Sequence, residues 1–575
     1  MNQWKATSLT ASTDHRLWFR HWPDGVPRTL GYPAITLDGL LSDAATNHPD
    51  VRATIYRGET LTYGQLNEFV DSFSAGLHEI GVGKGDRVSV LMANCPQAVI
   101  VYFGILRAGG VIVQTDGMLS PKEIADLDVD TGTETAVVLD ALLEKTFLAT
   151  KRAQLKRLVI VPSDEWMPRG DSSSGHAERL TVDPGLPAYD FKGLLRGEGQ
   201  KSTDSGACPD DVAVLQQTGG TTGIPKCAML THANLIANAC QTAAWLPDGK
   251  PGREAFLSVI PFSHAYGLTT ALFTPVKLAA AMVMRTGSGG VSEILALAEQ
   301  RGVTIFPGVP ALFSAIVRSS EVGRHDLSSL RICISGSEPL RPELQAEFEK
   351  TTHVHLVEGY GLSEASPVTH CNPFFGMSKE GIGIPYPDTD AKILDLDKGA
   401  DEMGVEQVGE LAVSGPQVMK GYWGRPDETA KVLRGKWLLT GDIATMDEDG
   451  FFHIIDRKKD MLISSGYKVY PREVEKIICE HPSVKECAVI GIADDRHGMT
   501  PKAYVVLKGD SVEARKNLVA FCEENLAEWK RPTSYSFMES LPKSPLGKVL
   551  KKSLRDDTFA ACRSPDGVSG QRTLV

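Results

Sequence analysis

Hydrophobic residues recur along this chain at two different spacings. After Tyr63 they return every three or four positions, at Leu66, Phe69, Val70, Phe73, Leu77 and Ile80. That spacing predicts a helix, and Gly81 is of the residue type that commonly ends one. Arg87 to Met92 is a short apolar run instead, which predicts a buried strand.

The same two patterns alternate further along the chain. Residues 294–300 have helical spacing, and residues 303–306 form the next short apolar run. Strands that alternate with helices are typical of parallel sheets covered by helices. We therefore expect an α/β fold for the larger, N-terminal part. Residues 271–284 are the longest apolar stretch, but Pro275 and Lys277 interrupt it, so it predicts buried core.

The pattern changes near Asp456, where a charged joint, Arg457 to Asp460, follows. After it the spacings predict a helix, two strands and a helix, at 471–481, 484–490, 503–507 and 512–526. This order predicts a small α+β domain. We expect domains at 1–455 and 456–555, with a disordered tail at 556–575. We also expect an aromatic-rich arm at 1–30 and a loop-rich insertion at 164–208.

One segment carries the strongest chemical signal. It holds three glycines, three threonines and one lysine, namely Thr218, Gly219, Gly220, Thr221, Thr222, Gly223 and Lys226. Glycines let several backbone N–H groups point at one place, which suits a phosphate. The P-loop of Walker-type NTPases requires glycine before the lysine and a hydroxyl residue after it, whereas Pro225 and Cys227 stand here. A nucleotide site of another kind is therefore indicated.

This segment resembles the phosphate loop of the adenylate-forming superfamily, which includes acyl-CoA synthetases, luciferases and peptide-synthetase adenylation domains. Such enzymes activate a carboxylate with ATP to an acyl-AMP, and most pass the acyl group to a thiol. The resemblance covers about residues 30–555. It implies a large domain with a small barrel-like subdomain, joined by a hinge to a mobile α+β domain. It also implies ATP, Mg²⁺ and CoA as ligands.

Further blocks match motifs of this superfamily in order. The block at 360–364 implies that Tyr360 and Gly361 lie along adenine, that Ser363 binds the α-phosphate, and that Glu364 holds magnesium. A second block, also placed along adenine, comprises Gly336, Ser337, Glu338 and Pro339. Glu338 departs from the small residue of many CoA-using members. Ligases that form acyl-AMP without CoA therefore stay open as an alternative.

The last blocks imply the remaining roles. Asp442 matches the aspartate that binds ribose, Arg457 a ribose or phosphate contact, and Lys459 the hinge. The loop that lines the CoA tunnel matches Ser465, Gly466 and Tyr467. Lys548 matches the lysine that bridges the carboxylate and the α-phosphate during adenylation.

Two positions near the expected pocket each allow two interpretations. His264 matches a histidine that lines the acyl or CoA channel in acyl-CoA synthetases, although a histidine in an apolar run is also common in a core. Cys227 stands where the superfamily has glycine. Its side chain either crowds the phosphates or points into the protein body.

The nearest resemblance is to bacterial long-chain and medium-chain fatty acyl-CoA ligases, through segments at 358–370, 383–389 and 467–475. The expected pocket segments, 237–244 and 306–310, are mostly apolar or small, which suits an acyl chain or an aromatic acid. We therefore expect an AMP-forming fatty acyl-CoA ligase. The alternatives are an adenylating ligase that passes the acyl group to an amine or to a carrier protein, and a nucleotide-binding protein without turnover.

Composition limits the kinds of molecule that this protein is expected to bind. A formal net charge of -12 argues against general nucleic-acid binding. The ten cysteines form no Cys-x-x-Cys pair, which is typical of reduced, cytoplasmic proteins. No apolar run reaches the roughly 18 residues of a membrane span. We expect a cytoplasmic monomer or homodimer that binds a small carboxylic acid and contacts membranes at most peripherally.

Overall fold

The computed structural model describes most of the chain. The described residues are 16–150, 155–163, 179–183, 186–195, 205–218, 226–285, 289–399, 401–464, 466–494, 498–509, 511–543 and 547–555. The chain divides into two compact units. We call 1–391, 413–438 and 449–451 the large unit, and 392–412, 439–448 and 452–575 the small unit. The expected tail, 556–575, lies outside the described residues.

The first sheet of the large unit has nine strands, with parallel strands in its centre and antiparallel strands at both edges. In sheet order the strands are β17 (Ile384–Pro385), β16 (Val368–Cys371), β15 (His355–Gly361), β14 (Ile332–Ser335), β13 (Ile305–Gly308), β11 (Ala255–Leu257), β12 (Ala281–Val283), β1 (Arg52–Tyr56) and β2 (Glu59–Thr62). Its core includes buried Phe306, Phe313 and Phe348.

The second sheet also has nine strands with a parallel centre. In order they are β20 (Gly421–Tyr422), β10 (Lys226–Thr231), β9 (Val212–Thr218), β4 (Val111–Gln114), β3 (Arg87–Leu91), β5 (Thr135–Leu139), β6 (Arg157–Val161), β8 (Leu186–Asp190) and β7 (Arg179–Asp183). The pair β7 and β8 falls inside the stretch expected to be loop-rich. That expectation is therefore wrong for this part, because strand β6 supplies a parallel partner for β8.

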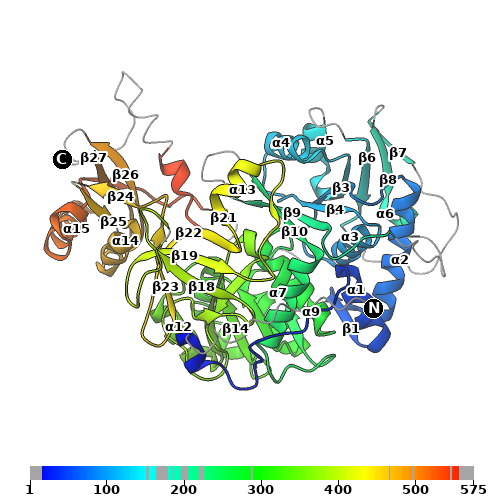
Figure 1. Ribbon diagram of the computed structural model, residues 1–575, viewed down its shortest axis with the longest axis horizontal. Helices are drawn as coiled ribbons and strands as arrows, with labels where there is room; N and C mark the ends of the chain where they lie inside the picture. The colour runs from blue at the N-terminus through cyan, green and yellow to red at the C-terminus, as the bar shows by residue number, and fades with distance from the viewer. Residues whose placement is uncertain are drawn as a thin grey trace. The chain divides into compact units, whose positions relative to one another are not determined.

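Helices accompany both sheets, as Figure 1 shows for the large unit. In chain order they are α1 (Leu37–Asn47), α2 (Tyr63–Glu79), α3 (Pro96–Arg107), α4 (Pro121–Thr131), α5 (Leu143–Thr150), α6 (Phe191–Leu194), α7 (His232–Ala244), α8 (Ala265–Gly267), α9 (Thr274–Lys277), α10 (Gly290–Arg301), α11 (Pro310–Val317), α12 (Pro342–Thr352) and α13 (Pro426–Val432). The expected helix from Tyr63 is confirmed as α2, which a capping box at Thr62 starts. The expected strand from Arg87 is confirmed as β3.

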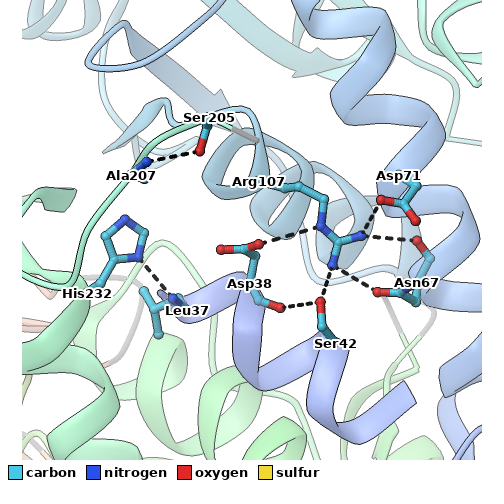
Figure 2. A network of polar contacts seen from close by, with 9 residues as sticks. All are labelled: Leu37, Asp38, Ser42, Asn67, Asp71, Arg107, Ser205, Ala207 and His232. Atoms are coloured by element: carbon cyan, nitrogen blue, oxygen red, sulfur yellow. Dashed lines mark hydrogen bonds and ion pairs between the residues drawn. The ribbon is translucent and has the colours of Figure 1, made fainter. Parts of the chain in front are cut away.

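The first three helices meet at one buried arginine (Figure 2). Arg107, the last residue of α3, lies 3.0 Å from Asp71 of α2 and 3.6 Å from Asp38 of α1. It also donates to Ser42 of α1 and Asn67 of α2, at 3.0 Å and 2.9 Å. A buried guanidinium needs such partners because its charge has left water. The network fastens α1 to the body of the large unit.

Short helical segments complete the large unit. Four are 3-10 helices, η2 (Leu17–His21), η3 (Asp140–Leu142), η5 (Val322–Arg324) and η6 (Ser363–Ala365), and η4 (Leu268–Phe273) is a π-helix. The buried Trp18 of η2 and the edge contact of Trp22 with Trp245 confirm the expected arm for residues 16–30. The stretch at 271–284 is confirmed as core, since Leu272, Phe273 and Val276 are fully buried.

Two smaller sheets contain the later strands. The third comprises β18 (Asp390–Leu394), β19 (Gly409–Ser414), β22 (Trp437–Met446), β21 (Leu433–Arg434) and β23 (Phe452–Arg457). The fourth, in the small unit, comprises β25 (Tyr467–Val469), β24 (Leu462–Ser464), β27 (Gly498–Leu507), β26 (Val484–Asp494) and β28 (Ser534–Phe537).

The fourth sheet packs against α14 (Pro471–Glu480) and α15 (Val512–Asn525), and η7 (Glu528–Lys530) precedes β28. Val474, Ile478, Leu518 and Cys522 of these helices are buried in its core. The sequence prediction of a smaller α+β region is confirmed, as is the α/β class of the larger part.

Candidate active site

The glycine-rich segment joins two antiparallel strands of the large unit. β9 and β10 pair so that Thr218 lies opposite Lys226. The other predicted members of this segment, Gly219 to Gly223, lie outside the described residues. Thr218 and Lys226 therefore mark the two ends of the segment, at one end of the β9–β10 hairpin.

The ammonium group of Lys226 has a carboxylate partner. It forms an ion pair with Glu428 of α13, which also pairs with Lys431. The Lys226 ammonium lies 5.3 Å from the centroid of the Tyr422 ring, and its side chain is only 10% exposed. The hydrogen bond from Lys226, then that from Lys431, lowers the pKa of Glu428 to about 2. This carboxylate is therefore charged at any working pH.

Tyr422 connects this lysine to the predicted metal ligand. Its hydroxyl donates to Glu364 Oε1 at 2.7 Å, and the backbone N–H of Met419 donates to the Glu364 carbonyl. Burial, then the charge of Glu364, raises the pKa of Tyr422, so the phenol keeps its proton. Lys226, Tyr422 and Glu364 thus gather in one place, as the sequence blocks suggested for the first and last of them.

Sequence reasoning missed Tyr422 and Glu428. Tyr422 lies in a segment with Gly421 and Gly424 just before α13, and Glu428 lies in the first turn of α13, after Pro426. An aromatic residue and a carboxylate within such a loop-to-helix junction are a usable signal. Their partners, however, are about sixty and two hundred residues away in sequence.

Cys227 points into the protein body. It is 2% exposed and packs with Val111, Val113, Leu127 and Leu215. Neighbouring side chains of a strand point to opposite faces, so Cys227 faces away from Lys226. Burial raises its pKa to about 12, which leaves an inert thiol. Of the two orientations considered for this residue, the structure has the buried one.

The second adenine block follows β14. The Gly336 N–H donates to Gly308 at the end of β13, at 3.1 Å. A Cβ on Gly336 would lie 2.9 Å from the ring of Tyr266, so the close approach requires glycine here. Ser337 and Pro339 are exposed, and Glu338 is half-buried. The block therefore lies at the carboxyl end of a parallel strand, where ligands of α/β sheets bind.

The Tyr360 block lies at the end of the neighbouring strand. β15 continues to Gly361, because antiparallel β16 pairs with its last residues. Tyr360 lies opposite His370 of β16, with ring centroids 5.9 Å apart. A Cβ on Gly361 would lie 2.2 Å from the carbonyl oxygen of Pro367. Half-buried Ser363 and Glu364 follow in η6.

His264 caps the short helix α8. Its Nδ1 accepts the backbone N–H of Tyr266 at 3.2 Å, so the neutral ring carries its proton on Nε2. The π-helix η4 follows directly, and π-turns often occur at functional sites. The Tyr266 hydroxyl donates to the Ile334 carbonyl at 2.9 Å. His264 is therefore half-buried and oriented by the backbone, which suits either a pocket wall or a structural cap.

The small unit brings the other predicted residues together. Asp442 of β22 lies opposite Arg457 of β23, and Arg457 Nε is 3.2 Å from Asp442 Oδ1. The Asp442 side chain is 6% exposed, whereas that of Arg457 is 39% exposed. Within the same strand, the Thr440 hydroxyl accepts the Asp442 N–H at 3.1 Å. The carboxylate keeps further acceptor capacity, which suits a vicinal diol.

Lys548 lies in the field of this pair. The nearby Arg457 guanidinium is the main cause that lowers the pKa of Lys548, to about 8. Partial loss of hydration and the charges of Arg472 and Lys459 act in the same direction, while Asp442 opposes them. Two like cations close together disfavour each other's charged form. Lys548 is exposed, and an anion bound beside it would raise this pKa again.

Lys459 and the predicted CoA loop lie in the same unit. Burial, then the charge of Arg457, lowers the pKa of Lys459. Gly466 has a φ of 85°, which favours glycine, before strand β25. Tyr467 is 54% exposed and stacks on Trp529, with ring centroids 4.5 Å apart. Ser465 lies outside the described residues.

The described part of the chain contains neither a metal-binding cluster nor a helix that spans a membrane. Within it, no group of three or more His, Cys, Asp or Glu side chains is placed to hold a metal ion. Glu364 would therefore be a lone protein carboxylate, a number that fits a magnesium ion whose other ligands are phosphates and waters. Among the same residues, no helix is long and apolar enough to cross a membrane.

Comparisons with known proteins find relatives along nearly the whole chain. A long-chain-fatty-acid–CoA ligase of Bacillus subtilis strain 168 is 39% identical over 551 residues, which cover 94% of this chain and 98% of that protein. A ligase of the same description from Escherichia coli O157:H7 is 34% identical, with the same coverage. The ATP-bound structure of MatB from Rhodopseudomonas palustris superposes with a TM-score of 0.79 at 26% identity, covering 92% of this chain and all of that one.

Family models account for most of the sequence. Residues 41–423 match the model described as AMP-binding enzyme, and residues 473–548 match the AMP-binding enzyme C-terminal domain. The first match includes the Lys226, Glu364 and Tyr422 cluster, and the second ends at Lys548. The chain therefore belongs to the AMP-binding enzyme family.

Proposed function

We propose that this chain joins a long-chain fatty acid to CoA, through an acyl-AMP intermediate that Lys548 helps to form. Membership in the family and two long-chain-fatty-acid–CoA ligases as relatives make the chain an AMP-forming acyl-CoA ligase. The chain length is the finer part of the proposal. The role of Lys548 in forming the acyl-AMP rests on one observation. The charges of Arg457 and Asp442, which lie in the same unit, act on Lys548.

In the first half-reaction the fatty carboxylate attacks the α-phosphate of ATP, and pyrophosphate leaves. The Lys548 ammonium bridges the carboxylate and the α-phosphate and offsets negative charge in the transition state. Asp442 accepts the ribose hydroxyls, and Arg457 contacts the ribose or a phosphate. Tyr360 and the block from Gly336 to Pro339 lie along adenine.

The phosphates lie on the large unit in this proposal. Thr218, Lys226 and the segment at 219–223 hold the β- and γ-phosphates, and Ser363 binds the α-phosphate. Glu364, whose Oε1 accepts the Tyr422 hydroxyl, would hold magnesium. A bound Mg²⁺ would neutralise phosphate charge and orient the chain of phosphates.

In the second half-reaction the CoA thiol attacks the acyl-AMP carbonyl, and AMP leaves. We propose that residues 456–555 turn about Lys459 between the two steps, so that Lys548 withdraws and the loop at 465–467 lines the thiol channel. His264 lines the channel mouth. Transfer to an amine or to a carrier protein is not favoured, because the relatives at 39% and 34% identity are long-chain-fatty-acid–CoA ligases.

Mass spectrometry of products tests this proposal. Purified protein is incubated with ATP, magnesium, CoA and a pool of acids from acetate to stearate, with benzoates, cinnamates and amino acids included. Long-chain acyl-CoA should dominate the products. Only short-chain or aromatic acyl-CoA would contradict the substrate class, and acyl-AMP without acyl-CoA would contradict the acceptor.

A further inference from the structure

Two cysteine sulfurs meet in the small unit. Cys479 lies in the last turn of α14, and Cys487 lies in β26. Their Sγ atoms are 3.4 Å apart. Nine of the chain's cysteines fall within the described residues, all as free thiols, and this is the sulfur–sulfur contact recorded among them.

The two thiols differ in access. Cys479 is exposed, whereas Cys487 is half-buried and its Sγ also donates to the Glu475 carbonyl at 3.4 Å. The hydrogen bond to Cys479, then burial, raises the pKa of Cys487 well above its usual value. The Cys487 S–H points to the Glu475 carbonyl, so this thiol keeps its proton in the reduced pair. Cys479 is the sulfur that a reagent in solution meets first.

The geometry requires only a local adjustment to form a bond. A disulfide has an S–S length of about 2.05 Å, so the sulfurs must approach by about 1.4 Å. Cys479 is the second-last residue of its helix, and helix ends open more easily than helix centres. Both residues belong to the small unit, so the step needs no movement between units.

We propose that Cys479 and Cys487 are a redox-modification site that a low-molecular-weight disulfide of the glutathione class converts to an intramolecular disulfide. The Cys479 thiolate attacks one sulfur of the oxidant, whose S–S bond breaks and releases one thiol. Cys487 then loses its proton and attacks the Cys479 sulfur of the mixed disulfide, which releases the second thiol. Two protein thiols are oxidised and one disulfide is reduced to two thiols.

The bridge fastens the end of α14 to β26. The same helix carries Glu475, which forms an ion pair with Lys551 at 2.7 Å and accepts the Val489 N–H at 2.7 Å. Lys551 lies three residues after Lys548. The modification would therefore stiffen the helix that supports the segment with Lys548.

Peptide mapping tests the site. The full chain at low concentration is incubated with glutathione disulfide, unreacted thiols are alkylated in acid, and the protein is digested with trypsin without reductant. Lys485 separates the two cysteines, so a bridge joins two peptides, one ending at Lys485 and one starting at Glu486. Dithiothreitol should separate them.

Two variants and an internal control distinguish the possible outcomes. C487S should accumulate a stable glutathione adduct on Cys479, and C479S should leave Cys487 largely unmodified. Cys208, which is also exposed, is the internal control and should take up glutathione in every variant. If Cys208 reacts while wild-type Cys479 stays unmodified or keeps its adduct, the proposal is wrong. Bridged peptides that come only from a covalent dimer on a non-reducing gel would overturn it equally.

Discussion

Two lysines of the proposed site have opposite surroundings. Lys226, in the large unit, is paired with the carboxylate of Glu428 and lies near the Tyr422 ring. Lys548, in the small unit, lies in a field dominated by the cations Arg457, Arg472 and Lys459. The first lysine has a built-in counter-ion, whereas the second lies where positive charge is in excess.

Because of this difference, the free energy of binding an anion differs between the two lysines. A phosphate that binds Lys226 must displace Glu428, which offsets part of the binding free energy and eases the release of pyrophosphate. An anion that reaches Lys548 relieves repulsion among cations and gains more as its negative charge grows. The second arrangement suits a transition state, in which charge builds up at the α-phosphate.

Among the substitutions at this site, Lys548→Ala should have the largest effect on activity. We expect the adenylation rate, followed by pyrophosphate release from the free acid, to fall about 10²- to 10³-fold, the usual loss when a preorganised charge is removed. Thioester formation from supplied acyl-AMP should persist, because that step does not use the lysine. Lys548→Arg is the control that keeps the charge. An equal loss in both half-reactions would contradict the assigned role.

Lys226→Ala should have a smaller effect that is confined to ATP. Loss of a charge-assisted hydrogen bond costs about 1.5–3 kcal/mol, so we expect KM for ATP to rise about 10- to 100-fold. Lys431→Met is the matched control, since Lys431 shares Glu428 but is 66% exposed. An unchanged KM in Lys226→Ala, or the same rise in the control, would show that Lys226 does not bind phosphate.

The pH dependence tests the cationic field around Lys548. Only the ammonium form assists adenylation, so kcat/KM for pyrophosphate release should fall as pH rises through about 8. Arg472→Gln removes one of the cations that lower this pKa, so the alkaline limb should move to higher pH by a few tenths of a unit. A profile that stays flat to pH 10, or a limb that moves downward, would contradict the charge environment.

Glu428→Gln should give the smallest change and the opposite sign. Without the competing carboxylate, Lys226 is available to ATP, so KM for ATP should decrease roughly two- to fivefold, the range of a screened ion pair. The pKa of Glu428 is about 2, so the effect should be constant between pH 5 and 9. Isothermal titration with ATP measures the change in binding affinity. Weaker binding would mean that Glu428 positions Lys226 rather than competing for it.

Periodicity predicted the elements whose partners are local or uniformly apolar. The helix from Tyr63 and the strand from Arg87 carry their pattern in a few consecutive residues. The strand at 303–306 instead lies at 305–308, because its register follows its neighbour β14. The last residues of β15, Gly359 to Gly361, pair with β16, a partner that comes later in the sequence.

The same distinction between local signals and distant partners applies to the residues of the candidate site. Lys226, Glu364, Asp442 and Lys548 were predicted from motifs, and the structure places neighbours beside each. Glu428 could not be paired with Lys226 from the sequence, because 202 positions separate them. The orientation of Cys227 likewise depended on which face of β10 packs on Val113, which only the sheet arrangement decides.

The arginine network at the start of the large unit has a practical consequence for fragments of this protein. The family match begins at residue 41, inside α1, and would omit Leu37 and Asp38. Leu37 donates its N–H to the His232 ring at 3.0 Å, and Asp38 is a counter-charge of Arg107 (Figure 2). A fragment cut at the family boundary would leave a buried imidazole acceptor unpaired and a guanidinium short of one carboxylate. Expression boundaries should therefore lie upstream of Thr36, which precedes the first turn of α1.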